Sequence, residues 1–509
     1  MKTVGILTAL LCMLLLAGCE EEFPAETATQ QTEDMITSME AEPVLSYEVP
    51  KSVPGILVNQ LGYTTGSSKV AVFRGREMPE QFYVKEESSQ KIVYTGTLEI
   101  KKQDSVSKEV SCYGDFSAVI SPGVYYIEAP ILGRSYSFEI GEAVYAPLFD
   151  EACKQYYYNR CGMTLTEEYA GDGAHNACHT AKAVSQTDTS LTLDASGGWH
   201  QDEKGQKNMM TAARTVSTLL LAYELYPQVF SDNCGIPESG NGVPDILDEI
   251  KYEIDWMLKM QQQESGAVYA GVSVYAKSGD ASSKAAEIYV EPISLDAGKA
   301  FAMALAKFSY LYQNYDTVYA TNCLKAADRA WKYVELNENN KETDEWEFAA
   351  AAELYRASGQ TSYSAHATRF LREKKYETVW NETTMLGCVT YLSTKHVVNT
   401  TYCENVMNYL MAKAEDISYV ARDAVYFTAG TKEQDNDTQL LFEMMCLSVV
   451  NHIISNHEYE TIIENHLHYF TGRNITAYNH ISDPVGIMKQ FESDAKLVVM
   501  LSGILYNGR

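Results

Sequence analysis

Two cysteines and two histidines lie close together in the sequence between positions 161 and 200. They are Cys161, Cys178, His179 and His200. Two thiolates and two imidazoles can complete the tetrahedral coordination of a structural zinc ion. Their spacing is not that of a zinc finger, and by spacing alone a buried free cysteine is the commoner state of such residues. The residue types allow a structural zinc site, and ordinary buried cysteines are the other interpretation that stays open at this point.

Side chains with oxygen atoms gather in a second segment, from position 236 to 249. Glu238, Asn241 and Asp245 offer carboxylate and amide oxygens, which are the ligands that calcium prefers. Pro244 also stands at the start of a helical pattern, and Asp245 follows it, where an acid favours the positive end of the helix dipole. Two interpretations stay open, a calcium site and a polar loop that caps this helix.

The first residues have the form of a leader for export. Lys2 precedes an apolar run from Val4 to Leu16, so residues 1–19 read as a signal peptide. The run is shorter than the roughly 20 residues that span a bilayer. Leu16-Ala17-Gly18-Cys19 resembles a bacterial lipobox, which implies that Cys19 is lipidated. We therefore expect an exported protein, anchored to the membrane by lipid and facing the cell exterior.

Charge is unevenly distributed along the chain. Residues 20–50 contain nine acidic and no basic residues, which is typical of a solvated, disordered tether. The whole chain has a formal net charge of −28, which opposes binding to nucleic acid or to an anionic lipid surface. We expect no nucleic-acid partner, and contact with the membrane through the lipid anchor only. The cysteines have no regular spacing, so no disulfide framework is predicted.

Residues 51–141 consist of short runs of alternating apolar residues, separated by Gly, Ser and Pro. This pattern predicts a small antiparallel β-sandwich. The expected strands are 56–58, 69–73, 81–84, 91–94, 116–120, 124–127 and 135–140. No catalytic constellation is visible among them.

The pattern changes in residues 142–509, where apolar residues recur at helical spacing and strand signals are scarce. A long series of helices without parallel strands predicts a toroid of helical hairpins. The expected helices include 210–226, 244–262, 296–312, 318–334, 346–358 and 439–455. The elements thus place the Cys and His residues near the beginning of a large helical domain.

Motifs in both parts carry a resemblance to a known family. They include Val58-Asn59-Gln60-Leu61-Gly62-Tyr63, Pro122-Gly123-Val124-Tyr125-Tyr126, Ser196-Gly197-Gly198-Trp199 and Ser239-Gly240-Asn241-Gly242-Val243-Pro244-Asp245. They resemble glycoside hydrolase family 9, the cellulases that carry an N-terminal immunoglobulin-like domain, over nearly all of the chain after the tether. The resemblance implies a multidomain fold, an immunoglobulin-like β-sandwich followed by an (α/α)6 toroid. It also implies an open cleft for β-1,4-glucan, inverting hydrolysis, calcium in many members, and in some a zinc at positions that match the Cys and His set.

The positions that the family uses for hydrolysis are occupied by other residue types. Inverting hydrolysis needs a carboxylate base and a carboxylic acid on opposite sides of the sugar. The resemblance places Gln201 and Lys204 at the family's two Asp positions, and Met488 at the position of its acid Glu. A lysine is a cation at neutral pH and accepts no proton from water, and a thioether has no proton to give. The sequence therefore predicts a degenerate hydrolytic centre.

Neighbouring carboxylates support a second hypothesis. Asp202 and Glu203 lie in the same loop and can supply a base, and Glu492 or Asp494 can supply an acid. Their side chains leave the backbone at other positions, and a displacement of about 1 Å can cost about 10²-fold in rate. An ordinary charged loop is the remaining interpretation of Asp202 and Glu203.

Three further residues are candidates for contact with sugar. The resemblance places Trp199 beside the cleft, where its ring can act as a platform. Arg473 and Asn474 either contact sugar or brace the last loop. The sequence as a whole predicts a monomeric surface lipoprotein that binds β-glucan or another plant polysaccharide, with an active glycosidase as the alternative.

Overall fold

The computed structural model describes residues 53–103, 110–276, 286–339, 342–429, 437–481 and 491–507. The predicted leader and tether, Cys19 and Met488 lie outside these ranges. No helix within the described ranges is long and apolar enough to cross a bilayer.

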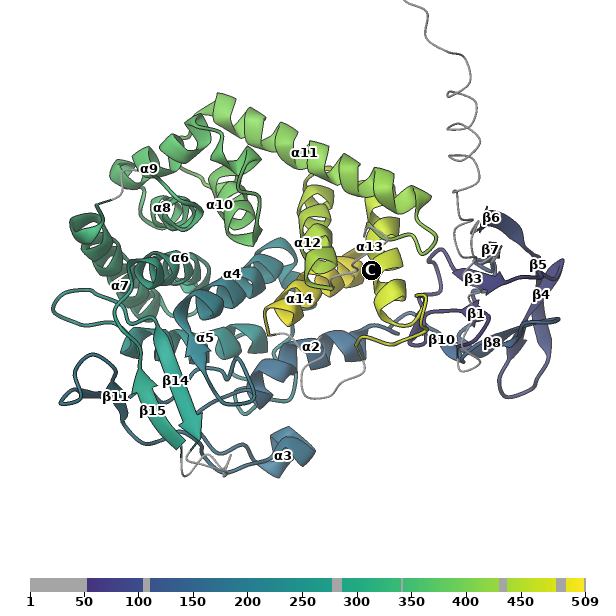
Figure 1. Ribbon diagram of the computed structural model, residues 1–509, viewed down its shortest axis with the longest axis horizontal. Helices are drawn as coiled ribbons and strands as arrows, with labels where there is room; N and C mark the ends of the chain where they lie inside the picture. The colour runs from purple at the N-terminus through teal and green to yellow at the C-terminus, as the bar shows by residue number, and fades with distance from the viewer. Residues whose placement is uncertain are drawn as a thin grey trace, which may run out of the picture. The chain divides into compact units, whose positions relative to one another are not determined.

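The strands from Ile56 to Ile140 form two sheets that share one apolar core (Figure 1). One sheet has the order β1 (Ile56–Leu57), β3 (Val70–Gly75), β7 (Val110–Asp115), β6 (Glu99–Gln103). The other has the order β2 (Gly62–Tyr63), β10 (Phe138–Ile140), β8 (Gly123–Ala129), β4 (Gln81–Glu86), β5 (Ile92–Thr97), with β9 (Gly133–Arg134) beside β8. Pairing is antiparallel except between β2 and β10. This is the β-sandwich expected from the alternating pattern, and it is the immunoglobulin-like domain that the resemblance implied.

One expected strand is wrong. The prediction placed a strand at 116–120, whereas the strand is β7, which ends at Asp115. The Asp115 side chain accepts the Ser117 N–H at 2.7 Å, and the Val119 N–H donates to the Phe116 carbonyl. These bonds turn the chain, and Phe116 is buried because of the turn and not because of strand alternation.

The helices after Ile140 form an inner and an outer layer (Figure 1). The inner helices are α4 (Met209–Leu225), α6 (Leu295–Tyr312), α8 (Glu345–Ser358), α10 (Glu382–Ser393), α12 (Asp437–Ile454) and α14 (Phe491–Asn507). Each contacts the next, and α14 contacts α4, so the inner ring closes. The outer helices are α2 (Ala146–Tyr158), α5 (Asp245–Lys259), α7 (Thr317–Asn337), α9 (Thr361–Arg372), α11 (Thr400–Asp423) and α13 (His457–Phe470). The arrangement is the predicted (α/α)6 toroid.

Local sequence explains where many of these helices begin. An Asn, Ser or Asp side chain accepts backbone N–H groups at the N-cap and replaces partners that the first turn lacks. The capping residues are Asn208, Ser294, Asp316, Asp344, Asn381, Asn399 and Asn456. The expected helices correspond to α4, α5, α6, α7, α8 and α12, with ends that differ by at most three residues. Short segments complete this part, namely α3 (Glu167–Ala170), η1 (Gly171–Gly173), η2 (Pro227–Val229) and η3 (Lys375–Glu377).

The helical domain also contains a small sheet that the sequence pattern did not predict. Its order is β12 (Thr192–Leu193), β11 (Ala183–Ser185), β15 (Ala286–Val290), β14 (Gly271–Ala276), β13 (Lys207–Asn208). The pairing of Lys207 with Val272 joins the loop before α4 to β14. This sheet therefore fixes one end of the segment in which the catalytic residues were expected.

The β-sandwich and the segment after α13 are joined by buried hydrogen bonds. The Asn59 amide lies 3.0 Å from His468 Nδ1, and the Gln60 N–H donates to the Thr471 carbonyl at 2.9 Å. Arg473 Nη1 donates to the Val70 carbonyl at 3.1 Å. These bonds make the loop at 471–477 part of a packed interface.

Candidate functional site

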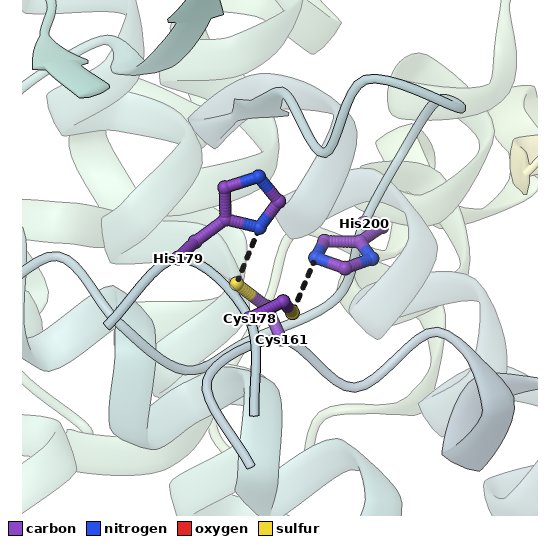
Figure 2. A group of neighbouring side chains, drawn as sticks. All are labelled: Cys161, Cys178, His179 and His200. Carbon is purple, nitrogen blue, oxygen red and sulfur yellow. Dashed lines mark hydrogen bonds between the residues drawn. The ribbon is translucent and has the colours of Figure 1, made fainter. Parts of the chain in front are cut away.

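The four predicted metal ligands converge in the structure (Figure 2). Their ligand atoms all lie within 4.8 Å of one another. Cys161 Sγ is 3.8 Å from His179 Nδ1, and Cys178 Sγ is 3.4 Å from His200 Nε2. A tetrahedron with metal–ligand bonds of about 2.0 to 2.3 Å has ligand atoms about 3.3 to 3.8 Å apart. The donor set and these two distances fit a tetrahedral zinc ion, whereas the 4.8 Å limit for the set as a whole is wider than such a tetrahedron.

Separate segments position these four side chains. Cys161 follows α2, Cys178 and His179 lie in the loop before β11, and His200 lies in the loop before α4. The Tyr252 hydroxyl of α5 donates to the Cys161 carbonyl. His179 has a φ of +47°, and a side chain at Gly205 would come within 2.6 Å of its ring. The ring thus has room only because residue 205 is glycine.

Two buried side chains, Lys207 and Glu253, support the segments that carry the cluster. Lys207 Nζ donates to the Ala195 and Gly197 carbonyls at 2.7 Å each and lies 3.7 Å from Cys161 Sγ. Glu253 of α5 accepts the Trp199 N–H at 2.6 Å. Burial lowers the pKa of Lys207 and raises the pKa of Glu253. The hydrogen bond with Cys161 lowers the pKa of the Cys178 thiol to about 6, although burial acts against it.

The loop from His200 to Asn208 continues from this cluster toward solvent. The Gln201 side chain donates to the Asn208 carbonyl at 3.0 Å and accepts the Asn208 N–H at 2.7 Å. Asp202 Oδ1 accepts the N–H groups of Lys204 and Gln206, and Oδ2 accepts the Gln206 side chain. Gln201 and Asp202 therefore hold the loop in shape, and Glu203 and Lys204 are exposed.

A pocket of about 460 Å³ opens beside this loop. Polar side chains dominate its lining, and Phe491 contributes an aromatic ring. The lining residues are Gln201, Asp202, Gln206, Lys207, Asn208, Thr211, Val272, Glu291, Thr438, Phe491, Glu492 and Ser493. Amides, hydroxyls and one ring are the groups that recognise hydroxyl-rich ligands. The pocket brings Asp202 and Glu492, two predicted catalytic candidates, to one site.

The carboxylates of the pocket already have protein partners. Glu492 Oε1 accepts from Nε and Nη2 of Arg214, both at 2.8 Å. Glu291 Oε1 accepts the Ser273 hydroxyl. Asp494, the alternative acid, is buried and does not line the pocket, and neither does Glu203. Met488, which the resemblance places at the family's acid position, lies outside the described residues.

The three residues expected to bind sugar are buried, so their placement does not fit that role. Trp199 is 0 % exposed, and its ring centroid lies 4.8 Å from that of Tyr156 and 5.8 Å from that of Phe491. Arg473 and Asn474 are also buried: Arg473 donates to Asn465 Oδ1 at 2.7 Å, and Asn474 Nδ2 donates to the Tyr469 carbonyl at 2.8 Å. The second interpretation of Arg473 and Asn474, bracing of the last loop, fits these contacts.

The three residues expected to bind calcium form ion pairs or hydrogen bonds with other side chains of the protein. Glu238 forms a two-point ion pair with Arg160, at 2.9 and 3.0 Å. Asn241 donates to Asp248 at 3.0 Å, and Asp245 accepts the Ser239 hydroxyl at 2.7 Å. Burial raises the pKa of Asp248 to about 6. These contacts bond a polar loop to the first turn of α5 and to Arg160, as in the alternative interpretation, although the N-cap residue Pro244 provides no side-chain cap.

Phe491, Glu291 and Thr438 line the pocket, and sequence reasoning did not identify them. Phe491 directly precedes Glu492, so an aromatic residue at the start of the last helix is a signal that could have found it. Glu291 stands between β15 and Pro292, where a strand ends. Thr438 carries no local signal, because its place depends on how α12 packs against α14.

Comparisons with known protein families divide the chain into the same two parts, the β-sandwich and the helical domain. A family described as glycosyl hydrolase family 9 matches residues 145–491, and a cellulase N-terminal Ig-like domain matches residues 51–134. Endoglucanase D of Acetivibrio thermocellus is 30% identical over 449 residues, which cover 82% of this chain and 71% of that protein.

Solved structures share the fold. A metagenome-derived glycoside hydrolase family 9 endoglucanase superposes with a TM-score of 0.80 at 23% identity, covering 88% of this chain and 98% of that one. A zinc-binding triple mutant of a family 9 endoglucanase superposes with a TM-score of 0.76 at 23% identity, covering 86% and 99%.

Proposed function

The chain belongs to glycosyl hydrolase family 9, and from that premise we propose that it binds a β-1,4-glucan chain in the pocket beside residues 201–208 with a degenerate hydrolytic centre. One observation carries the proposal. The resemblance assigns Gln201 and Lys204 to the positions of the family's two aspartates; in the structure the Gln201 amide is bonded to Asn208, and the Lys204 side chain is exposed. Neither side chain can take a proton from an attacking water.

The lining of the pocket supports binding. Phe491 can offer a ring to the apolar face of a sugar, and Trp199 and Tyr156 pack behind that ring. Gln206, Asn208 and Thr211 add amide and hydroxyl groups that can bond sugar hydroxyls. Binding by such groups needs no general acid or base, so it is compatible with the changed residues.

Two measurements on a soluble form that begins after Cys19 test this function. We expect titration calorimetry to show heat with cello-oligosaccharides, and the Phe491→Ala variant to bind about tenfold more weakly, which corresponds to about 1.4 kcal/mol. Tyr506→Ala is the matched control, because Tyr506 lies on the same helix but is exposed and does not line the pocket. Absence of heat with any β-glucan would contradict the proposal.

An active glycosidase is the second candidate, and one observation favours it: Asp202 and Glu492 line the same pocket. In this case Asp202 or Glu203 serves as the base, and Glu492 or Asp494 as the acid. Robust release of reducing sugar from a polysaccharide panel, abolished by Asp202→Asn and by Glu492→Gln, would establish this function in place of the first.

We also propose that the Cys161, Cys178, His179 and His200 cluster binds one structural zinc ion. Such an ion would link the end of α2 to the loop that carries residues 201–208, without taking part in proton transfer. Metal analysis of the purified protein should find about one zinc per chain. Protein that folds normally and contains no zinc would refute the assignment.

For the location of the protein we propose export and lipid attachment at Cys19. The short apolar leader and the acidic tether support this. Mass spectrometry of the mature N-terminus should find a lipidated Cys19, and a Cys19→Ala variant should leave the membrane fraction. A wild-type protein that fractionates with soluble proteins would contradict the proposal.

A further inference from the structure

A second pocket lies at the other end of α4. The pocket described above is lined by Asn208 and Thr211, at the start of this helix, whereas the second is lined by Tyr223 and Glu224, near its end. Twelve residues separate Thr211 from Tyr223, which corresponds to about 18 Å along an α-helix. The second pocket has a volume of about 290 Å³. The two pockets are therefore separate sites.

Tyrosine rings dominate the second pocket. Tyr223 and Tyr310 come from α4 and α6, and Tyr315 comes from the turn between α6 and α7. The hydroxyls of Tyr223 and Tyr315 lie 2.7 Å apart, within hydrogen-bond distance. The guanidinium of Arg356 lies 4.6 Å from the centre of the Tyr310 ring. These contacts fix the rings before any ligand arrives, which lowers the entropy cost of binding.

A buried network of charges forms the base of this pocket. Glu224 accepts from Lys307 at 2.9 Å and also from Arg356, and both cations contact the buried Glu353. Lys307, Arg356 and Glu353 are at most 2 % exposed, whereas the Glu224 side chain is 18 % exposed. Burial would raise the pKa of Glu224, but the two cations outweigh it and lower this pKa to about 2. Glu224 is thus a fixed carboxylate with both oxygens bonded to cations, and it lines the pocket.

Two amide side chains and the exposed Lys395 complete the polar groups. Gln313 and Asn314 are exposed and line the same pocket as Tyr315. An amide both donates and accepts, and a carboxylate accepts from two hydroxyls at once. Rings with fixed positions beside such groups match a sugar, which has an apolar C–H face and hydroxyls around its edge.

We propose that this pocket is a second saccharide-binding site, which holds a β-glucan chain at the end of α4 away from the first pocket. Tyr315 stacks on a sugar ring, and Glu224 and Gln313 bond its hydroxyls. The site performs no hydrolysis and keeps a glucan chain near the protein. It takes the same class of ligand as the proposed function, but it depends on different residues and is tested separately.

Affinity electrophoresis in gels that contain soluble mixed-linkage β-glucan tests the site. The full soluble chain would be compared with Tyr315→Ala, Gln313→Ala, the double variant, and Phe491→Ala as the first-pocket variant. Tyr419→Ala is the matched control, an exposed tyrosine of α11 outside both pockets. Tyr315 and Gln313 lie in an exposed turn, so these substitutions should leave folding intact, which circular dichroism would check.

We expect Tyr315→Ala to weaken retention about tenfold, equivalent to about 1.4 kcal/mol, and Tyr419→Ala to leave it unchanged. In the Phe491→Ala background the double change at 313 and 315 should abolish the remaining retention. Unchanged retention on adding Tyr315→Ala, both to the wild-type chain and to the Phe491→Ala variant, would overturn this site. It would not contradict binding in the first pocket. Loss through Tyr315→Ala with no effect of Phe491→Ala would support this site and contradict the first. No retention of the wild-type chain would overturn both.

Discussion

The two sides of the segment from Trp199 to Asn208 are held in different ways. On the metal side, His200 meets Cys161, Cys178 and His179, which come from other loops, and the α5 carboxylate of Glu253 holds the backbone before it. On the pocket side, Gln201 and Asp202 form their side-chain bonds within the loop itself. One side thus joins distant segments, whereas the other maintains only its own local shape.

This difference explains how one loop can carry a complete Cys and His cluster beside a pocket whose hydrolytic residues, under the proposed function, have changed. Removing a side chain that joins distant segments exposes or empties buried positions, so its cost extends to the whole domain. Replacing a side chain that faces a pocket alters the chemistry there and leaves the packing intact. We infer that the stability of this domain depends on the metal side, and its chemistry on the pocket side.

The largest expected effect is on the metal side. We expect Cys178→Ser to lose the bound zinc and to lower the free energy of unfolding by about 4 kcal/mol, a size that is typical of a lost metal site. Chelation of the wild-type protein should have a similar effect. Metal analysis and denaturant unfolding measure both. The control is Cys403→Ser, a half-buried cysteine outside the cluster. Equal stability of Cys178→Ser and Cys403→Ser would contradict the inference that the stability of this domain depends on the metal side.

The next effect concerns chemistry on the pocket side. We expect Gln201→Asp, Lys204→Asp and Met488→Glu together to raise hydrolysis of β-glucan by at least about 10²-fold, because a placed base and acid each contribute at least that factor. Reducing-sugar release measures the gain. A matched variant with Asn, Asn and Gln at the three positions has similar shapes without the charges and should gain nothing. If the carboxylate variant folds normally and gains no hydrolysis, residues other than these three must also differ from those of an active centre.

A smaller effect is expected within the loop. Asp202→Ala removes two backbone N–H partners at an exposed site, so we expect a loss of about 1 kcal/mol in the free energy of unfolding. Bound zinc should be unchanged, since Asp202 contacts only its own loop. Glu203→Ala, at the exposed neighbour, should change stability by less than about 0.5 kcal/mol. Zinc loss in Asp202→Ala would show that the two sides are coupled.

Local signals predicted much of the fold and one site. Helical periodicity and capping residues located α4 to α8, and the resemblance singled out the four Cys and His residues that the structure brings together. The sequence could not predict that Trp199 is buried, because Tyr156 and Phe491, which cover it, lie far away in the chain. The sequence left the role of Arg473 open between sugar contact and bracing of the last loop for the same reason, since its partner Val70 belongs to the β-sandwich.

The smallest effect tests whether Glu492 belongs to the packing or to the chemistry. The Arg214–Glu492 ion pair is about one-third exposed, and pairs of this kind contribute about 0–1 kcal/mol. Glu492→Gln keeps an acceptor for Arg214, so we expect a small loss of stability that disappears at high salt, because salt screens exposed charges. Lys251→Gln, in the comparably exposed pair with Asp255, is the control. Thermal unfolding at low and high salt measures the two. If Glu492→Gln instead removes a measurable hydrolytic activity and leaves stability unchanged, Glu492 acts as the acid in hydrolysis. The pocket side would then hold an active hydrolytic centre and not a degenerate one.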